Sequence, residues 1–120
     1  MHALVIDDAR TTRMILRQIL QNLGFDVTEA GNGREGLEQL RRLDQVDVVL
    51  VDCHMPEMDG FAFLQAVRAD SAFSRLQVIM VAGAEESGLA ARSVEAGANA
   101  YIAKPFKKEL IQEKIACLRP

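Results

Sequence analysis

The chain has 120 residues, 49% of them hydrophobic, and a formal net charge of −3 at pH 7. This length suits one ordinary domain with a real core, so we expect residues 1–120 to form a single domain. A negative charge without any basic block gives no support for nucleic-acid binding, and no apolar run has the roughly 20 residues needed to span a membrane.

The cysteine content and the start of the chain both favour a cytoplasmic protein. The two cysteines, Cys53 and Cys117, are far apart and match no metal-ligand spacing. No signal peptide is recognisable, so we expect the thiols to stay reduced in the cytosol.

Short apolar runs typical of strands alternate with longer stretches of helical periodicity. The predicted strands span residues 3–6, 25–29, 47–51, 78–81 and 100–103, and the predicted helices span residues 11–23, 34–43, 61–69, 86–96 and 107–118. This alternation predicts an α/β protein with three layers, a (βα)5 doubly wound parallel sheet covered by helices on both faces. Right-handed crossovers leave few topologies, and the one that brings the acidic residues together has the strand order 2-1-3-4-5.

Local signals refine two of these helices. For the first helix we expect Thr11 or Thr12 at the N-terminal cap, Ile15 on the buried face and Gly24 just beyond the end. In the fourth helix, Gly88 falls in the first turns and should weaken that end by up to about 1 kcal/mol relative to alanine.

Charged side chains follow three of the predicted strands. Asp7 and Asp8 come directly after the first strand, Asp52 follows the third, and Lys104 follows the fifth. Because the carboxyl ends of parallel strands open onto one edge of a sheet, we expect these four side chains to converge. Neighbouring carboxylates repel by roughly 4 kcal/mol per pair at an effective dielectric near 20. The cluster therefore predicts a bound cation, a shared proton or a chemical role.

Four motifs together point to a known family. They are Asp7-Asp8, Val-Asp-Cys-His-Met-Pro-Glu-Met-Asp-Gly at 51–60, Gly97-Ala98, and Lys104-Pro105-Phe106. With them, the chain resembles a response-regulator receiver domain of two-component signalling over essentially its whole length, and is similar to the single-domain chemotaxis type. The resemblance implies a flavodoxin-like fold without an output domain. It also implies a signalling switch that, as an enzyme, at most catalyses its own phosphorylation and dephosphorylation.

The resemblance assigns roles to the clustered residues. Asp52 would accept a phosphoryl group from a phosphohistidine of a sensor histidine kinase or phosphotransfer protein. Mg²⁺ would be bound directly by Asp8, Asp52 and the backbone carbonyl of His54, and largely through water by Asp7. Lys104 would form an ion pair with the phosphoryl group.

The resemblance also implies how the signal leaves the site. Tyr101 would be the aromatic residue that changes rotamer on activation, and the Lys104–Pro105 peptide bond would be cis. The altered surface would comprise the fourth helix, the fifth strand and the fifth helix, and an unknown output protein would bind it. We expect a monomer that binds neither nucleic acid nor a membrane.

The sequence departs from the family pattern at Ala82, where the family usually has Thr or Ser. A hydrogen bond lost to a charged group is worth about 1.5–3 kcal/mol, so we expect altered switching unless a neighbour substitutes. The candidates are Ser87 and the backbone N–H of Gly83.

Three other function classes remain open at this point. A phosphate-independent receiver-like adaptor is supported by Ala82 alone. An aspartyl-phosphate hydrolase would share Asp52 but would place an acid or similar group two residues later, where this chain has His54. A flavin or nucleotide carrier would need a glycine-rich phosphate-binding loop, and none follows the first strand.

Overall fold

The computed structural model describes residues 1–83, 88–104 and 106–118. Five parallel strands form one sheet in the order β2-β1-β3-β4-β5, as the sequence predicts. The strands are β1 (His2–Ile6), β2 (Asp26–Ala30), β3 (Val48–Asp52), β4 (Gln77–Gly83) and β5 (Ala100–Lys104). The helices are α1 (Arg10–Asn22), α2 (Gly33–Arg42), α3 (Gly60–Ala69), α4 (Leu89–Glu95) and α5 (Lys108–Leu118), and a short 3-10 helix, η1, spans Ser71–Phe73.

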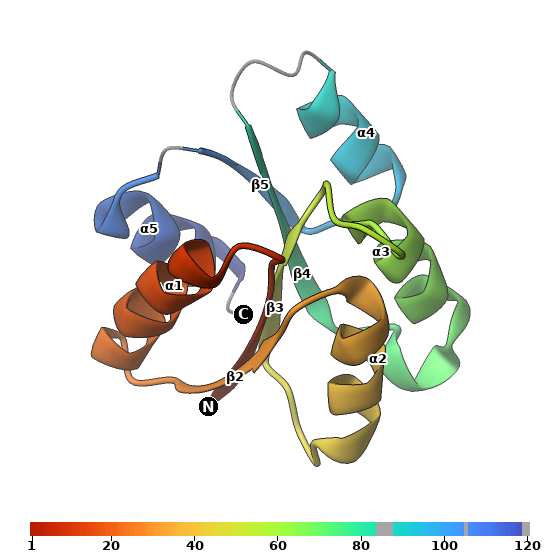
Figure 1. Ribbon diagram of the computed structural model, residues 1–120, viewed down its shortest axis with the longest axis horizontal. Helices are drawn as coiled ribbons and strands as arrows, with labels where there is room; N and C mark the ends of the chain where they lie inside the picture. Colours follow the sequence, from red (N-terminus) through yellow and green to blue (C-terminus); the bar gives the residue numbers. More distant parts are fainter. Residues whose placement is uncertain (84–87, 105, 119–120) are drawn as a thin grey trace.

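Helices cover both faces of the sheet. Figure 1 shows α1 and α5 on one side and α2, α3 and α4 on the other, with the sheet edge-on between them. The three-layer architecture of the sequence-based prediction is therefore confirmed. No helix within the described ranges is both long enough and apolar enough to cross a bilayer.

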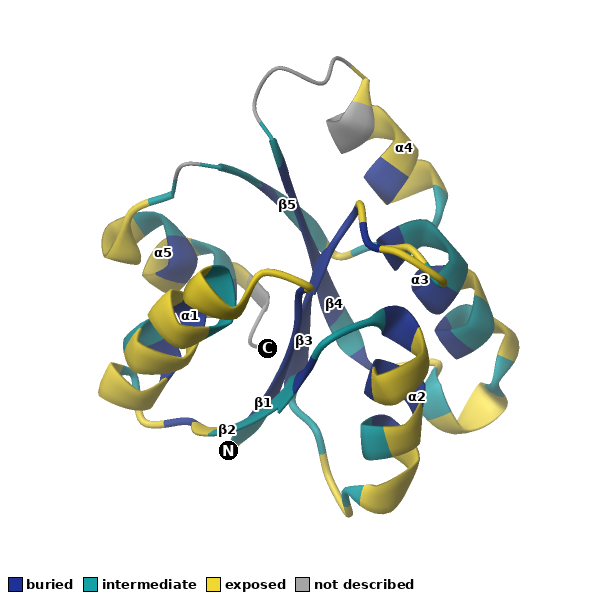
Figure 2. Cartoon of the chain, in the orientation of Figure 1, coloured by how far each residue is buried: buried dark blue, intermediate teal, exposed yellow. Residues whose placement is uncertain are grey.

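The central strands form the core because their side chains are apolar on both faces. Alternate residues of a strand point to opposite faces. Leu4 and Val49 accordingly pack beneath α2 and α3, whereas Val5 and Leu50 pack beneath α1 and α5. Figure 2 shows the resulting buried band along β1, β3 and β4. Such continuous apolar strands are typical of parallel sheets that are covered on both sides.

Helix α1 begins and packs differently from the prediction. Its N-cap is Ala9, and neither Thr11 nor Thr12 has that role. The backbone N–H of Ala9 instead donates to Oδ1 of Asp7, so the acidic residue satisfies the start of the helix. Ile15 is 48% exposed rather than buried. Gly24 does lie just beyond the helix, with φ +95°, as expected of a residue that ends a helix.

Helix α4 is shorter than predicted. Gly88 is its N-cap, with φ 81°, and therefore lies outside the helix that it was expected to weaken. A left-handed φ is easily reached by glycine, which lacks a Cβ. The first two residues of the predicted range, 86 and 87, lie outside the described residues.

A close backbone approach connects α3 to the end of β3. Gly60, the first residue of α3, donates its N–H to the carbonyl of Cys53. A Cβ at Gly60 would overlap the carbonyl oxygen of Asp52. Glycine is therefore what allows the 53–59 loop to return to the strand end.

Candidate functional site

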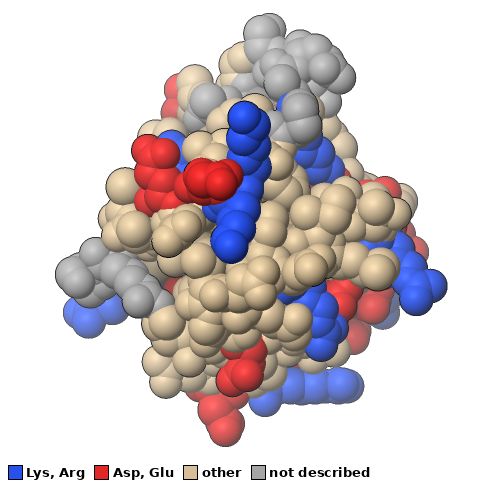
Figure 3. Space-filling model, turned by 90° about the vertical axis from the view of Figure 1, so that its left-hand side faces the viewer, with Lys and Arg blue, Asp and Glu red and all other residues tan. Residues whose placement is uncertain are grey.

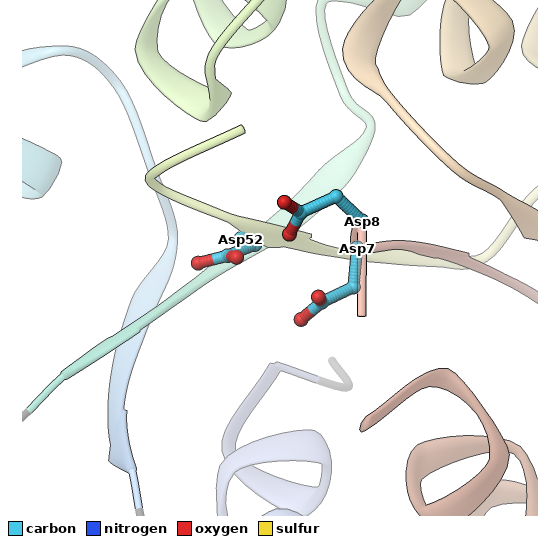
Figure 4. Close-up of side chains that lie close together, drawn as sticks. All are labelled: Asp7, Asp8 and Asp52. Carbon is cyan, nitrogen blue, oxygen red and sulfur yellow. The ribbon is translucent and has the colours of Figure 1, made fainter. Parts of the chain in front are cut away.

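Three carboxylates meet at the carboxyl edge of the sheet. Strands β1 and β3 are neighbours, and Ile6 pairs with Val51, so the residues that follow each strand lie side by side. One oxygen from each of Asp7, Asp8 and Asp52 lies within 4.8 Å of the others. Figure 4 shows the three side chains directed toward a shared space. The predicted convergence is thus what the structure shows.

Asp7 is the most constrained of the three acids, with only 1% of its surface exposed. Its N–H donates to the carbonyl of Ala30 at 3.1 Å, and its Oδ1 accepts the N–H of Ala9 at 2.8 Å. Its Oδ2 accepts from Nζ of Lys104 at 3.3 Å. Asp8, by contrast, is exposed at the rim.

Asp52 is 7% exposed and lies at the end of β3. Burial, and next the charge of Asp7, raise the pKa of its carboxyl above the ordinary value, and the nearby Lys104 acts against them. Nζ of Lys104 lies 3.6 Å from Oδ2 of Asp52, and the N–H of His54 approaches Oδ1 at 3.4 Å. One Asp52 oxygen therefore faces a cation while the carboxyl as a whole resists ionisation.

Lys104 comes from the far end of the chain, 97 residues after Asp7. It ends β5, where it pairs with Gly83 of β4. Its side chain is 30% exposed and bridges Asp7 and Asp52. The expected cis bond to Pro105 involves a residue outside the described ones.

Ala82 and Tyr101 lie on the same face of the sheet, on the neighbouring strands β4 and β5. Ala82 is 1% exposed and pairs with Ala103 of β5. Tyr101 pairs with Met80 and packs, partly buried, against the core that includes Ala82. Of the two suggested substitutes for the missing hydroxyl, Ser87 is outside the described residues, and Gly83 ends β4 beside Lys104.

Sequence reasoning missed two residues near the site. Arg13 of α1 donates to the backbone carbonyl of Asp7 at 2.6 Å. Glu57, in the loop after β3, has φ 69°, a left-handed conformation that costs about 1 kcal/mol or more without glycine. No residue pattern signals either feature, because an arginine in a first helix and a glutamate in a turn-rich loop are both ordinary.

The donor set fits a hard divalent cation. Mg²⁺ prefers oxygen ligands and binds through one or two carboxylates while it keeps several waters. Asp7, Asp8 and Asp52 provide carboxylate oxygens close together, and the exposed Asp8 leaves one side open to water. A divalent ion would also offset the repulsion among the three carboxylates.

Comparison with known proteins agrees with this geometry. Residues 3–116 match the family described as the response regulator receiver domain. The chain is 37% identical over 116 residues to chemotaxis protein CheY1 of Helicobacter pylori, covering 96% of this chain and 94% of the relative. It is 42% identical over 109 residues, 90% of this chain, to the sensor histidine kinase CheAY of the same species, but spans only 14% of that protein.

Solved structures give the same result. The chemotaxis protein CheY4 of Vibrio cholerae has a TM-score of 0.90 at 28% identity, over 98% of both chains. The receiver domain of a sensor histidine kinase from Pseudomonas aeruginosa has a TM-score of 0.88 at 26% identity, over 98% of this chain and 95% of that one. Its active-site cleft holds a coordinated magnesium ion. With its fold and its sequence in agreement, this chain belongs to the response regulator receiver domain family.

Proposed function

We propose that this chain is a phosphorylation-dependent signalling switch and that Asp52 is its phosphoacceptor. The observation that carries the proposal is the position of Asp52, nearly buried between a lysine and two further acids. A carboxylate placed this way can receive a phosphoryl group whose negative charge is partly neutralised by the neighbouring lysine. Phosphoryl transfer depends mainly on such positioning and charge neutralisation.

The reaction would be a direct transfer from a phosphohistidine. A carboxylate oxygen of Asp52 forms the new P–O bond while the P–N bond breaks, and the bonding electrons return to the imidazole nitrogen. Asp8, Asp52 and the backbone carbonyl of His54 would hold Mg²⁺ directly, and Asp7 largely through water. The ion would supply positive charge toward the phosphoryl oxygens. Lys104, already between Asp7 and Asp52, would turn its ammonium group to the phosphoryl group.

The donor would be a histidine kinase or a phosphotransfer protein in the cytoplasm. Two relatives are named for chemotaxis and for a sensor histidine kinase, which suggests a chemotaxis-type pathway for this chain as well. Met14 and Ile15 on α1 are 57% and 48% exposed and give the donor an apolar surface near the site. Figure 3 shows this side of the molecule, where uncharged atoms predominate between scattered acidic and basic side chains.

The signal would leave through α4, β5 and α5, which would bind a separate output protein. Tyr101 would report the state of the site, and its packing against the same core as Ala82 supports this role. Without a hydroxyl at position 82, we propose weaker coupling between phosphorylation and this surface. His54 is exposed beside Asp52 and would modulate the rate at which water removes the phosphoryl group.

The test is intact-mass spectrometry after incubation with Mg²⁺ and acetyl phosphate. We expect one phosphoryl group on the wild-type chain and none on the Asp52→Asn variant. If both proteins gain a phosphoryl group, the acceptor is a residue other than Asp52. An acyl phosphate that decays quickly would escape mass spectrometry. If neither protein gains mass, we therefore measure the binding of fluoroberyllate, a stable mimic of the phosphoryl group, in the presence of Mg²⁺.

The second candidate is a receiver-like adaptor that signals without phosphate, and Ala82 is the observation that favours it. Failure of the wild-type chain to bind Mg²⁺ or fluoroberyllate would select it. Asp7, Asp8, Asp52 and Lys104 stand together as a charged site, which argues for the phosphoacceptor.

A further inference from the structure

The side chain of Arg13 connects helix α1 to the backbone of the acidic site. Its Nη1 donates to the carbonyl oxygen of Asp7 at 2.6 Å, and its Nε donates to Oε1 of Glu29 at 3.2 Å. The side chain is only 20% exposed. A planar guanidinium with donors in a fixed fork can satisfy two acceptors at once, which an ammonium group does less rigidly.

Glu29 on β2 holds the other end of this connection. Its second carboxylate oxygen accepts from Nη1 of Arg17 at 2.6 Å. The hydrogen bond from Arg17, together with that from Arg13, lowers the pKa of the Glu29 carboxyl from its ordinary value. Glu29 is therefore a fixed acceptor at neutral pH, and it keeps the Arg13 guanidinium oriented toward Asp7.

The carbonyl that Arg13 binds belongs to the peptide group between Asp7 and Asp8. The N–H and Oδ1 of Asp7 are already bound by Ala30 and Ala9. With its carbonyl bound as well, the rotation of that peptide group is restricted. The direction in which the chain places Asp8 follows from that rotation. Asp8 is exposed, and its carboxylate accepts no hydrogen bond from the residues that the structure describes, so its position depends on the backbone that carries it.

We propose that Arg13 is a positioning residue for the cation site, holding the Asp7–Asp8 peptide so that the Asp8 carboxylate stays within reach of Asp7 and Asp52. The inference rests on the proposed function, in which Asp8 is a direct Mg²⁺ ligand. Groups that orient metal ligands typically contribute about 10- to 100-fold to metal affinity. The role is unusual because Arg13 is a cation placed near the site of another cation.

Because Arg13 and Mg²⁺ carry charges of the same sign, the two possible effects of losing Arg13 on Mg²⁺ affinity have opposite directions. Removing a positive charge near the site would relieve Coulomb repulsion and would by itself tighten the binding of Mg²⁺. Losing the restraint on Asp8 would weaken it. In Arg13→Gln we expect the affinity for Mg²⁺ to fall roughly tenfold, the lower end of the range for ligand-orienting groups.

The matched control is Arg17→Gln. Arg17 lies on the same helix, carries the same charge and binds the same Glu29, but within the described part of the chain it makes no hydrogen bond or ion pair with Asp7. We expect its Mg²⁺ affinity to stay within about twofold of the wild type, since the ion pair of a half-exposed arginine with Glu29 is lost but the hydrogen bond from Arg13 to Asp7 remains. Affinities are measured by calorimetric titration with magnesium chloride in the absence of a phosphodonor, and stability by urea unfolding. Unchanged or tighter binding in Arg13→Gln, or equal weakening in both variants, overturns the proposal.

Two further variants separate the possible failures. Asp8→Asn removes the proposed ligand itself. If it binds Mg²⁺ as the wild type does, the proposed metal site is wrong. If it binds weakly while Arg13→Gln binds normally, only the role of Arg13 is wrong. Should Arg13→Gln not fold, Arg13→Lys replaces it, because lysine keeps the charge without the fork. Reduced affinity in that variant supports the proposal, and full affinity overturns it.

Discussion

At the scale of single residues, the burial of Asp52 has a cost in stability at neutral pH. Its burial and the charge of Asp7 favour the neutral carboxyl, and these raise its pKa in the folded protein. The folded state then binds the proton more tightly than the unfolded chain does. In the metal-free protein, the stability contributed by Asp52 is therefore highest below the ordinary pKa of 3.8 and falls as the pH rises through the raised pKa.

Asp52→Asn should therefore stabilise the metal-free protein at pH 7. Single stabilising substitutions typically contribute about 0.5–2 kcal/mol. The gain should shrink as the pH falls and disappear below the ordinary pKa. Urea unfolding at several pH values, without Mg²⁺, measures it. Asp44→Asn is the control, because Asp44 is an exposed carboxylate and its loss should change stability little. A loss of stability in Asp52→Asn at pH 7 would contradict the raised pKa of Asp52.

The sequence predicts the clustered residues well because their convergence follows from topology. Once the strands are known to be parallel and β1 is placed beside β3, Asp7 and Asp52 must meet at one edge. Arg13 and Glu57 were missed because their features are geometric. A bond to a backbone carbonyl, or a left-handed φ, leaves no pattern in residue type.

At the scale of elements, strand positions were easier to predict than helix ends. Buried strands require continuous apolar residues, and these are visible in the sequence. The start of α1 was misplaced because its N-cap is Ala9, whose N–H donates to Asp7, and no threonine side chain caps the helix. Ile15 was taken as buried on periodicity alone, but α1 covers the sheet with a narrower face around Leu16 and Leu20.

The junction between β3 and α3 gives a prediction at this scale. Helix propensity alone favours Gly60→Ala by up to about 1 kcal/mol. The added Cβ would overlap the Asp52 carbonyl oxygen and lie 3.0 Å from Cα of Cys53, both of them backbone atoms that cannot swing aside. The overlap should dominate, and we expect a destabilisation of about 2–3 kcal/mol by urea unfolding.

Gly31→Ala is the matched control for that substitution. There the nearest atom is Oε2 of Glu35, 3.2 Å away at the end of a flexible side chain. Its effect should stay within about 0.5 kcal/mol. If Gly60→Ala were as mild as Gly31→Ala, the close approach between α3 and β3 would not constrain the site loop.

At the scale of the whole molecule, the proposed switch requires that the state of Asp52 reach α4, β5 and α5. Ala82 and Tyr101 share one packed core, so a change at the end of β4 has a path to β5. What Ala82 lacks is a hydroxyl that can bond to a charged group, an interaction worth about 1.5–3 kcal/mol.

Ala82→Thr should therefore strengthen the response of Tyr101 to fluoroberyllate and Mg²⁺. The chain has one tyrosine, so fluorotyrosine gives a single ¹⁹F resonance from that position. We expect a larger shift of the resonance in Ala82→Thr than in the wild type. Ala82→Val matches threonine in shape but has no hydroxyl, and should respond as the wild type does. An equal response in the valine and threonine variants would assign the effect to packing instead.

The span of Lys104 has a consequence for biosynthesis. Asp7 leaves the ribosome before its partner Lys104, which follows 97 residues later. Until β5 joins the sheet, the nascent chain carries three neighbouring acids without the cation that bridges two of them in the finished fold. A chain released before Lys104 would keep the aspartates but lose the bridge. Completion of the sheet and completion of the site are therefore a single event.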